Sequence, residues 1–306
     1  MKAKGVITLS ILLWSTVSVF AQNEEDALRY GRQLTPSSGR SWGMGGAMGA
    51  LGADLSSFFT NPAGIGMYKR GNAEMSLGLT DVRSNAAYMG QQSTDFSTRL
   101  ELNSFGIVGG QKENDKGISF NFGVAHVKSN QFAERVRIEG LTTNSSILDV
   151  FSGQAGSIQS DLLANELPFG AGAAYSVGAI KPSDDSLFYF PSAQGEVQQM
   201  KNIVRRGNTS ITAFGLGMGI KDKLYLGLVI NFHGSRFTQN SDHRETYQSD
   251  QAIQEFTYSD DLTSDGTGFS MRLGAILKPS KWLRVGAAIQ TPTVITIREA
   301  WNVNTT

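Results

Sequence analysis

The chain has 306 residues, with 27 Lys and Arg balanced by 27 Asp and Glu, 35 Gly and no Cys. A net charge of zero leaves no basic face large enough to neutralise many phosphates, so no nucleic-acid partner is expected. The glycine content is well above the usual share of about 7%, and the absence of Cys is compatible with an oxidising compartment. The 40% share of hydrophobic residues would by itself also suit an ordinary soluble domain.

Residues 1–21 have the pattern of a secretory signal peptide. Two lysines precede an apolar run from Val6 to Phe20, which closes on the small-residue cleavage pattern Val19-Phe20-Ala21. A membrane anchor is the alternative, but the run is shorter than the roughly 20 residues that a spanning helix needs. We therefore expect an exported protein. No later window is apolar enough for a spanning helix, so a membrane form would have to span as strands.

Residues 22–72 contain a glycine-dense, weakly charged segment that precedes the first alternating stretch. Glycine permits tight turns and close packing but disfavours regular helix, so we expect a compact and irregular structure. The glycines concerned are Gly43, Gly45, Gly46, Gly49 and Gly52. Asn61 before Pro62 favours a turn, because the residue before proline is pushed out of the helical region. The Asn61 side chain has donors and acceptors to tie this turn to other groups, and a plain surface turn is the alternative.

Three parts of this segment resemble the N-terminal hatch of the FadL/TodX family, outer-membrane channels for fatty acids and other hydrophobic molecules. They are Gly39 to Gly46, Ala47 to Asp54, and Asn61 to Gly66 with its Asn61-Pro62-Ala63-Gly64 turn. Asp26-Ala27-Leu28-Arg29-Tyr30 is similar to the start of mature members from Bacteroidetes-type bacteria, and a more diffuse likeness continues to about Trp301.

The resemblance implies an all-β protein in the outer membrane of a Gram-negative bacterium. Its fold would be an antiparallel transmembrane β-barrel, with fourteen strands in the family. Residues 22–72 would form a small hatch of short helices and turns inside the lumen, and residues 73–306 would form the barrel wall.

The remainder of the chain alternates with a period of two. Residues 224–232 place Leu224, Leu226, Leu228, Ile230 and Phe232 on one face, and residues 118–126 repeat the pattern. Further alternation occurs at 73–79, 171–179, 214–220, 269–277 and 283–289. An apolar face opposite a face of Gly, Ser, Asn or Arg fits a barrel wall between lipid and lumen. A soluble β-sandwich with a dry core shows the same alternation and is the alternative.

Connection lengths favour the barrel. Short charged turns are expected at 111–116, 221–223 and 278–281, and long connections at 128–168 and 234–266. Outer-membrane barrels have this asymmetry, with the short turns in the periplasm. An even number of strands must separate turns on one side. Residues 195–206 are therefore assigned as an ascending strand between descending strands at 169–180 and 208–220, and the count reaches about ten strands.

Ten strands leave the implied barrel incomplete. An open wall would expose unpaired backbone groups to lipid at several kcal/mol each. The expectation is a chain that lacks roughly four C-terminal strands relative to such a barrel. The alternative is a smaller complete barrel, closed by pairing of residues 295–303 with residues 73–88. A closed wall has no free edge, so a monomer is expected.

Apolar residues recur at roughly helical spacing within the 128–168 connection. They include Ile147, Leu148, Phe151, Leu162 and Leu163. In the resembled family, extracellular loop helices collect hydrophobic substrate, so these residues are candidates for capture. Packing of the loop onto the barrel rim is an equally open alternative, because apolar patches are only suggestive of binding.

Catalytic and metal-binding patterns are weak. Gly39-Arg40-Ser41-Trp42-Gly43 matches G-x-S-x-G by letters but lacks the preceding strand that a nucleophile elbow requires. The three histidines, His126, His233 and His243, are scattered and give no zinc spacing. No enzyme activity, metal or cofactor is expected.

The resulting hypothesis is an outer-membrane channel for passive uptake of hydrophobic compounds such as long-chain fatty acids, gated by the N-terminal hatch. Its partners would be a fatty-acid-like ligand and outer-membrane lipid. The alternative is a barrel that acts as a scaffold or shuttle for protein secretion or surface assembly. Arg99, Arg205, Arg206 and Arg272 are candidate carboxylate contacts by charge alone.

Overall fold

The structure is a computed structural model that describes residues 24–31, 38–110, 113–143, 145–184, 188–247 and 252–306. The chain divides into two compact units, Met1–Leu34 and Thr35–Thr306. Helix α2 (Glu24–Gly31) is the described part of the first unit. The expected signal peptide, residues 1–21, lies outside the described residues. Of the segment expected to form the hatch, residues 22–72, residues 35–72 belong to the second unit together with the strands that follow, whereas residues 22–34 belong to the first unit.

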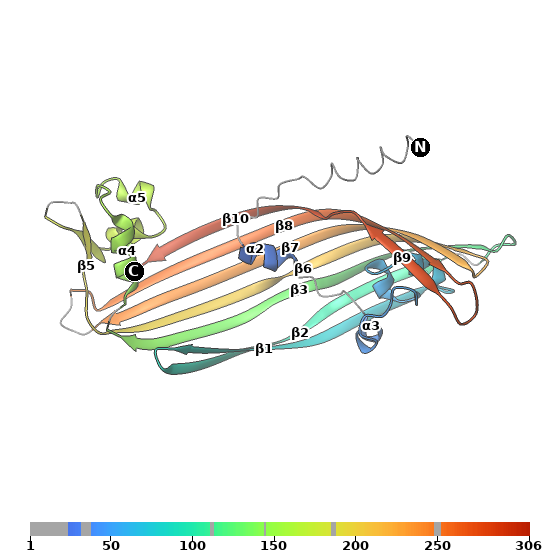
Figure 1. Ribbon diagram of the computed structural model, residues 1–306, viewed down its shortest axis with the longest axis horizontal. Helices are drawn as coiled ribbons and strands as arrows, with labels where there is room; N and C mark the ends of the chain where they lie inside the picture. The colour runs from blue at the N-terminus through green and yellow to red at the C-terminus, as the bar shows by residue number, and fades with distance from the viewer. Residues whose placement is uncertain (1–23, 32–37, 111–112, 144, 185–187, 248–251) are drawn as a thin grey trace, which may run out of the picture. The chain divides into compact units, whose positions relative to one another are not determined.

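The second unit is built on one antiparallel sheet, as the alternating sequence predicted. Its strands are β1 (Asn72–Tyr88), β2 (Gln91–Gly110), β3 (Ile118–Thr142), β6 (Val197–Ile220), β7 (Leu224–Tyr247), β8 (Glu255–Leu277), β9 (Val285–Gln290) and β10 (Val294–Thr305). The spatial order is β1-β2-β3-β6-β7-β8-β10 (Figure 1). β9 pairs with β8 as well, next to β10 along the same edge. Pro292, which has no N–H to donate to a ladder, lies between β9 and β10.

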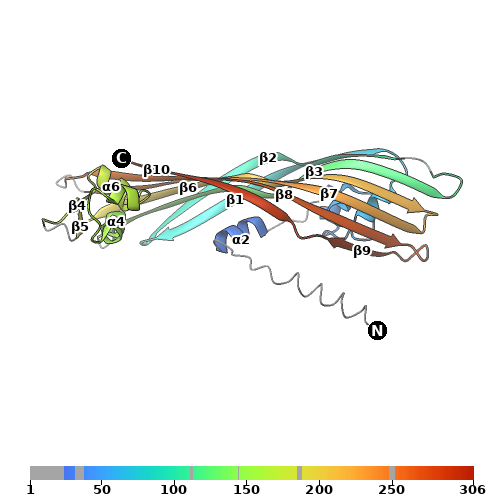
Figure 2. The same ribbon diagram turned by 90° about the horizontal axis from the view of Figure 1, so that it is seen from above.

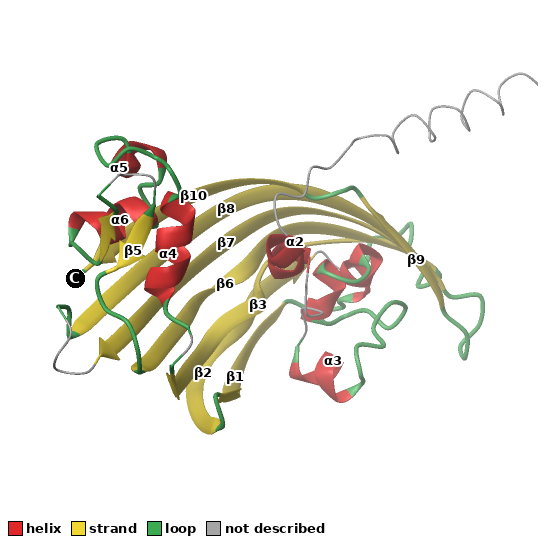
Figure 3. Ribbon diagram, turned by 60° about the vertical axis from the view of Figure 1, so that its left-hand side comes forward, coloured by secondary structure: helices red, strands yellow, loops and turns green. Residues whose placement is uncertain are grey.

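The sheet is curved and is not closed. β10 pairs with β8, and β1 pairs with β2, so within the described residues the alternative pairing of residues 295–303 with residues 73–88 is not formed. Three short helices lie on the concave side of the sheet (Figure 3). They are α3 (Gly39–Gly43), η2 (Leu55–Phe58) and η3 (Pro62–Met67). We call described residues 38–71, which contain them, the hatch.

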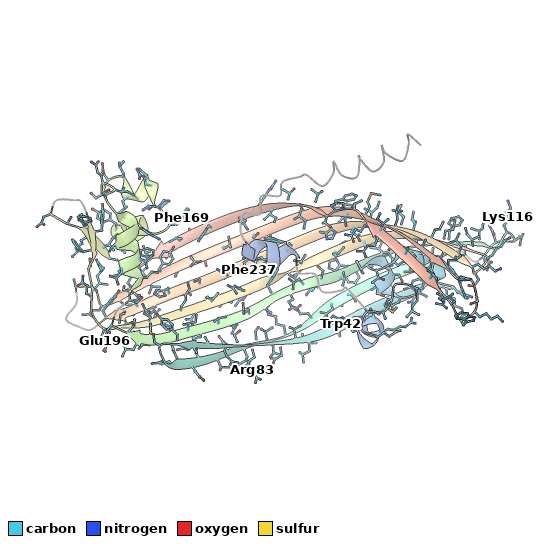
Figure 4. All side chains as sticks on the ribbon, viewed as in Figure 1. Trp42, Arg83, Lys116, Phe169, Glu196 and Phe237 are labelled. Atoms are coloured by element: carbon cyan, nitrogen blue, oxygen red, sulfur yellow. The ribbon has the colours of Figure 1, made fainter. Side chains whose placement is uncertain are left out.

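The two ends of the strands differ. Lys116 marks one end, and Phe169 and Glu196 mark the other (Figure 4). The first, which we call the turn end, carries the short connections 111–117, 221–223 and 278–284, close to those expected. The second, the loop end, carries Met89-Gly90 between β1 and β2, residues 143–196, and the β7–β8 connection. Only one connection at the loop end is therefore long.

The expected long connection at 234–266 is wrong. β7 continues to Tyr247 and β8 begins at Glu255, so most of this stretch is paired strand. In the same way, β3 continues to Thr142 instead of ending near residue 128. Both strands lose their hydrophobic alternation where outward residues become polar. β7 stays paired with β8, and β3 stays paired with β6 past a register shift between Lys128 and Asn130.

The described residues of 143–196, namely 143, 145–184 and 188–196, form a small body at the loop end of the sheet (Figure 2), and we call them the loop region. Its elements are α4 (Ile147–Ala155), α5 (Leu163–Glu166), α6 (Ala171–Ser176), β4 (Ile180–Pro182) and β5 (Tyr189–Pro191). The expected strand at 169–180 is wrong, because α6 occupies its centre. Gly172 packs against the carbonyl oxygens of Leu163 and Leu167 with no room for a side chain, and alanine favours helix.

The expected ascending strand at 195–206 is also wrong. These residues and residues 208–220 belong to one strand, β6, which pairs with β3 and β7 along its length. Gly207 has a φ of 128° and lies so close to the carbonyl of Arg236 that any side chain would collide with it. Glycine at this position keeps the strand continuous, whereas in the sequence it looked like a break. The two errors cancel, so the assumed directions of the later strands remain correct.

Within the part of the chain that the structure describes, no helix is both long and apolar enough to cross a membrane.

Candidate functional site

The face of the sheet turned away from the hatch carries an apolar belt. Strand register aligns its side chains in rows; for example, Phe122, Leu216, Leu228 and Leu273 follow one another across β3, β6, β7 and β8. The belt comprises Phe120, Phe122, Val124, Phe214, Leu216, Leu226, Leu228, Ile230, Phe232, Phe269, Met271, Leu273 and Leu277. Phe122, Leu216 and Leu273 are 64%, 60% and 54% exposed. These are large side chains, so in water the belt would be unfavourable.

The height of the belt suits a bilayer. It extends on β7 from Leu224 to Phe232, about 27 Å along the strand at 3.4 Å per residue. At the usual strand tilt this is about 21 Å along a barrel axis, close to the apolar band of about 25 Å in transmembrane barrels. Beyond Phe232 the same face of β7 becomes polar, with Arg236 bonded to Asp265 across the strands at 2.9 Å.

The opposite face of the same rows is lined by glycine. Gly217, Gly227 and Gly274 are register partners on β6, β7 and β8. A Cβ added to any of them would lie under 3.0 Å from atoms of η3 or of Asn61. In the next pair toward the loop end, a Cβ on Gly215 would lie 2.5 Å from Ile65 and 2.7 Å from Phe58, and one on Gly123 would lie 2.5 Å from the carbonyl of Ile107 and 3.0 Å from Phe58. We call these five residues the glycine seat. Their lack of side chains lets the hatch rest directly on the wall backbone.

Asn61 connects the hatch to the wall. Its Oδ1 accepts from the backbone N–H of Ala63 at 3.1 Å and caps η3. Its Nδ2 donates to the carbonyl of Gly49 at 2.8 Å and to that of Ala275 on β8 at 3.2 Å. Pro62, Ala63 and Gly64 are buried beside it. The four residues of the Asn61-Pro62-Ala63-Gly64 turn therefore lie together between hatch and wall, and the turn is not a surface turn.

Asn121 provides a second tie, which the sequence analysis missed. Its Nδ2, on β3, donates to the carbonyls of Ile65 and Tyr68, each at 2.9 Å. The last carbonyls of a helix have no partner within the helix and need donors from elsewhere. Asn121 is the register partner of Gly217, so this donor lies in the same row as the glycine seat. The available signal was a polar residue between Phe120 and Phe122.

An apolar contact completes the hatch site. Phe58, Phe59 and Ile65 of the hatch are buried. They belong to a cluster with Leu55, Tyr68, Val108, Ala125, Val127, Ile211, Ala213 and Val229, the last six from β2, β3, β6 and β7. The inner wall at this level is therefore covered by hatch side chains.

The glycines expected to shape the hatch differ in what they do. Gly45, Gly46 and Gly52 have φ values of 61°, 79° and 64°, a region that disfavours other residues. At Gly43 and Gly49, φ is not positive and an added Cβ would meet no atom within 4 Å. Of the five, only Gly52 is closely packed, against Met67 and Gly64. Gly45, Gly46 and Gly52 thus adopt a backbone conformation that favours glycine, and Gly52 is also closely packed.

The candidate capture residues lie mostly inside the loop region. Leu148, Phe151 and Leu163 are buried in a cluster that includes Tyr247 and Phe256 of the wall. Ile147 is partly buried against the same cluster, and Leu162 is 43% exposed. This arrangement corresponds to the packing alternative, and these residues do not form an outward landing surface. The exposed large apolar residues of the loop region are Val150, Leu162, Phe169, Val177, Phe188 and Phe190.

A buried carboxylate attaches the loop region to the wall. Glu245 on β7 accepts hydrogen bonds from Ser146 Oγ at 2.6 Å and the backbone N–H of Ile147 at 2.8 Å, both at the start of α4. Gln199 Nε2 donates at 2.7 Å and the Tyr247 hydroxyl at 2.5 Å. Burial alone would raise the pKa of Glu245. The hydrogen bonds, that from His243 first among them, outweigh burial and hold the pKa at about 2.

The wall has a break in its hydrogen bonding between β2 and β3. The two strands pair only from Ser104 to Gly110 of β2, next to the belt. Toward the loop end the β1–β2 hairpin touches its neighbours through side chains, such as Tyr88, whose hydroxyl donates to Gln199 Oε1 at 2.6 Å. Lys128 Nζ and Glu101 Oε2, 3.0 Å apart, lie where the pairing ends.

Within the described residues, Ser41 and the histidines of the weak catalytic patterns are not brought together. Ser41 is buried in α3, and its hydroxyl has no hydrogen-bond partner among the described residues. His126 bonds Thr212, and His233 bonds Ser270 at 2.9 Å, but its Nδ1 has no partner in the described chain to orient it as a base. Among the described residues no group of three or more His, Cys, Asp or Glu could hold a metal ion.

Comparisons with known proteins give distant structural likenesses. No protein-family model matches the chain, and no curated protein matches it. A solved structure titled CymD monoaromatic hydrocarbon channel aligns over 89% of this chain and 96% of its own, with 11% identity and a TM-score of 0.20. A mutant porin from Rh. blastica aligns over 77% of this chain and 100% of its own, with 11% identity and a TM-score of 0.12. At such low TM-scores the assignment of the fold rests on the strands of this chain.

Proposed function

We propose that this protein is an outer-membrane β-barrel channel for the passive uptake of hydrophobic compounds such as long-chain fatty acids, with the hatch as its gate. The single observation that carries the proposal is the contrast between the two faces of the same strand rows. The apolar belt suits lipid, while the glycine seat behind it holds a plug. Neither a dry sandwich core nor a water-exposed sheet needs this combination.

The belt supports a membrane location. A soluble β-sandwich covers its apolar faces with a second sheet, but in the described chain only the other face, under the hatch, is covered. At about 25 cal/mol per Å² of apolar surface, a row of exposed Phe and Leu side chains strongly favours transfer out of water. Lipid provides that environment.

Closure of the wall is part of the proposal. Among the described strands none pairs with the outer edge of β1 or of β9 and β10, and a bilayer offers no water to satisfy the backbone groups of such edges. In the membrane we propose that further strands pair with both edges and complete a monomeric barrel.

Gating follows from how the hatch is held. Its polar ties, from Asn61 and Asn121 to backbone carbonyls, are neutral hydrogen bonds worth about 1 kcal/mol each, so they can exchange on a functional timescale. We propose that a shift of the hatch opens the lumen. We propose that the break in pairing between β2 and β3, at the loop-end edge of the belt, serves as a lateral exit.

Uptake of labelled palmitate by cells with and without the gene tests this function. The chain has no Cys, so a disulfide can lock the hatch without competing thiols. Ala63 of the hatch and Ile276 of β8 belong to one buried cluster. We expect the Ala63→Cys, Ile276→Cys double variant to transport only after reduction, with the two single variants as controls. Equal uptake with and without the gene would reject the proposed function.

A further inference from the structure

An aromatic row marks the loop-end edge of the apolar belt. Phe214, Phe232 and Phe269 lie on the outward face of β6, β7 and β8, and the centroids of neighbouring rings are 5.9 and 5.8 Å apart. Transmembrane barrels carry such aromatic girdles where the hydrocarbon ends and the lipid headgroups begin. In the proposed membrane location, the outward residues just beyond Phe232 therefore face the headgroups of the outer leaflet.

A shallow recess lies on the outward face directly beyond this aromatic row. Its volume is about 340 Å³, and Gly234, which lines it, leaves the outward position on β7 without a side chain. Gly234 and Arg236 are two and four residues beyond Phe232, which along tilted strands is about 5–10 Å beyond the belt. This range overlaps the headgroup layer, about 5–8 Å thick on each side of the hydrocarbon core. The polar side chains that line the recess are those of Asn208, Ser210, Arg236, Asp265 and Thr267.

Three outward arginines, which we call the arginine band, concentrate positive charge at this level. Arg236 on β7 is the register partner of Asp265 on β8, and Asp265 is in turn the register partner of Arg298 on β10. Arg206 on β6 lies on the outward face one row further from the belt. Across β6, β7, β8 and β10, Asp265 is the one acidic outward residue in these two rows.

The arginine band has donors that the protein does not use. Asp265 accepts from Arg236 Nε at 2.9 Å, and within the described residues the two Nη groups of Arg236 have no hydrogen-bond partner. Asp265 therefore holds the guanidinium while leaving its outer edge available. Arg206 and Arg298 are exposed, and in the part of the chain that the structure describes neither forms an ion pair.

The level and the chemistry of these groups match a phosphorylated headgroup. In the next two outward rows of β7 and β8 the charged residues are Asp242 and Asp261, so on these strands the positive charge is confined to the level next to the belt. Arginines at this level attract anionic lipid, and a guanidinium binds phosphate through parallel N–H donors. The hydroxyl and amide groups of Ser210, Thr267 and Asn208 can exchange hydrogen bonds with the hydroxyls of a sugar.

We propose that the arginine band and the recess beside it bind a phosphorylated glycolipid of the outer leaflet. The phosphate lies against the arginines, the sugar lies against the polar lining of the recess, and the acyl chains lie along the apolar belt. The inference goes beyond transport, because it uses the membrane location in the proposed function and neither the channel nor the hatch. The glycolipid is a bound neighbour of the wall and not a transported compound.

Native mass spectrometry of the purified full-length protein in detergent tests this site. The probes are monophosphoryl lipid A, the same glycolipid after removal of its phosphate, and phosphatidylglycerol. We expect the wild type to bind the phosphorylated glycolipid about tenfold more tightly than either other lipid. The triple variant Arg206→Gln, Arg236→Gln, Arg298→Gln should lose about tenfold in affinity for the phosphorylated glycolipid alone, a loss that suits charge-assisted hydrogen bonds at an exposed site.

Two further variants separate the charge of the site from its shape. Arg244→Gln removes a charge from the same face of the same strand, eight residues beyond Arg236, and should match the wild type. Gly234→Leu fills the recess and leaves every charge in place. The atom nearest to an added Cβ at this position is Ser210 Oγ at 3.5 Å, so the strand accommodates a side chain there. We expect Gly234→Leu to weaken binding of the phosphorylated glycolipid severalfold.

The outcomes distinguish this site from the proposed function. Equal binding of the three lipids by the wild type, or unchanged glycolipid binding in the triple variant, would overturn the lipid site while palmitate uptake by cells continues. Selective glycolipid binding without palmitate uptake would support the site and count against the channel. Recovery of the native protein in the soluble fraction of lysed cells would count against both. If the triple variant does not fold, Gly234→Leu decides, and wild-type affinity in that variant would overturn the site.

Discussion

The contact between the glycine seat and η3 can be tested with a single methyl group. In Gly227→Ala the new Cβ would lie 2.1 Å from the carbonyl carbon and oxygen of Pro62, and 2.5 Å from the nitrogen of Ala63. These are backbone atoms, so no side-chain rotation relieves the collision. To reach the 3.4 Å of an ordinary contact, η3 would have to move away from the wall by about 1.3 Å, the difference between the two distances.

That movement has a calculable cost. It would stretch the 3.2 Å bond from Asn61 Nδ2 to Ala275 beyond hydrogen-bond range and weaken both bonds from Asn121. Each is worth about 1 kcal/mol, and overpacking by one methylene usually costs about 1–3 kcal/mol. A net loss of about 3 kcal/mol in hatch docking is a reasonable central value. It corresponds to a roughly hundredfold larger population of the undocked hatch.

Hydrogen–deuterium exchange of the amides in η3 measures this population, because exchange through local opening tracks the free energy of opening. The matched control is Gly234→Ala on the same strand, where the nearest atom to an added Cβ is Ser210 Oγ at 3.5 Å. We expect exchange in residues 62–68 to rise roughly a hundredfold in Gly227→Ala and to stay near the wild-type value in the control. Equal protection in both variants would refute the idea that the seat requires glycine.

Three further predictions concern other contacts. Asn121→Ala removes the side-chain donor from the carbonyls of Ile65 and Tyr68, and Ile65 keeps only the 3.4 Å bond from the Tyr68 N–H, so exchange at the end of η3 should rise about tenfold while the loop region stays protected. The folded pKa of Glu245, about 2, is below its ordinary value of 4.5. Its contribution is therefore complete above pH 4.5 and is lost as pH falls toward 2, so an acid-active protease should cleave the loop region faster over that interval. At neutral pH, a protease active there should cleave the loop region of Glu245→Gln faster than that of the wild type. Asp265→Asn breaks a largely exposed pair with Arg236, so the thermal midpoint should change by less than the error of about 1 °C.

The sequence predicted the strands best where lipid and hatch act on opposite faces. At 224–232 and 118–126, large apolar residues on one face alternate with an opposite face that includes Gly227 and Asn231 or Ser119, Asn121 and Gly123, and both stretches are strands of the belt. Beyond Phe232 the outward positions become polar, for example Arg236 and Asn240, while inward positions remain mixed. The period-two signal then disappears even though the backbone ladder continues to Tyr247.

The errors in the middle of the chain have a local cause. Ala171 to Ala179 alternates by letters, but its small residues pack a helix against α5, and only that tertiary contact distinguishes helix from strand. The assigned strands 195–206 and 208–220 left Gly207 between them, yet it is a strand residue placed against the carbonyl of Arg236. In both cases the structure is decided by a contact with a residue elsewhere in the chain. Local alternation or composition does not reveal such a contact.

The residues of the site also fall into two groups, those that the sequence alone indicates and those that only the folded structure brings together. The Asn61-Pro62 turn is local and could be found from the chain alone. The glycine seat needs the register of three strands, since Gly217, Gly227 and Gly274 become neighbours only when β6, β7 and β8 pair. Charge identified Arg205 and Arg206 equally, but Arg205 faces inward and pairs with Glu134, which lies 71 residues away along the chain, whereas Arg206 faces outward.

The glycine seat also bears on the open state of the proposed channel. Side chains that filled the space next to the hatch would remain in the lumen after the hatch moved and would narrow the passage. Glycine at the five seat positions instead lets the plug approach the backbone closely when it is docked and leaves almost no side-chain volume when it withdraws. Substitution by alanine at Gly274, where a Cβ would meet Asn61 Oδ1, should therefore impair the closed state far more than the conductance of the open one. A variant that lowered open-state conductance without increasing hatch exchange would contradict this reasoning.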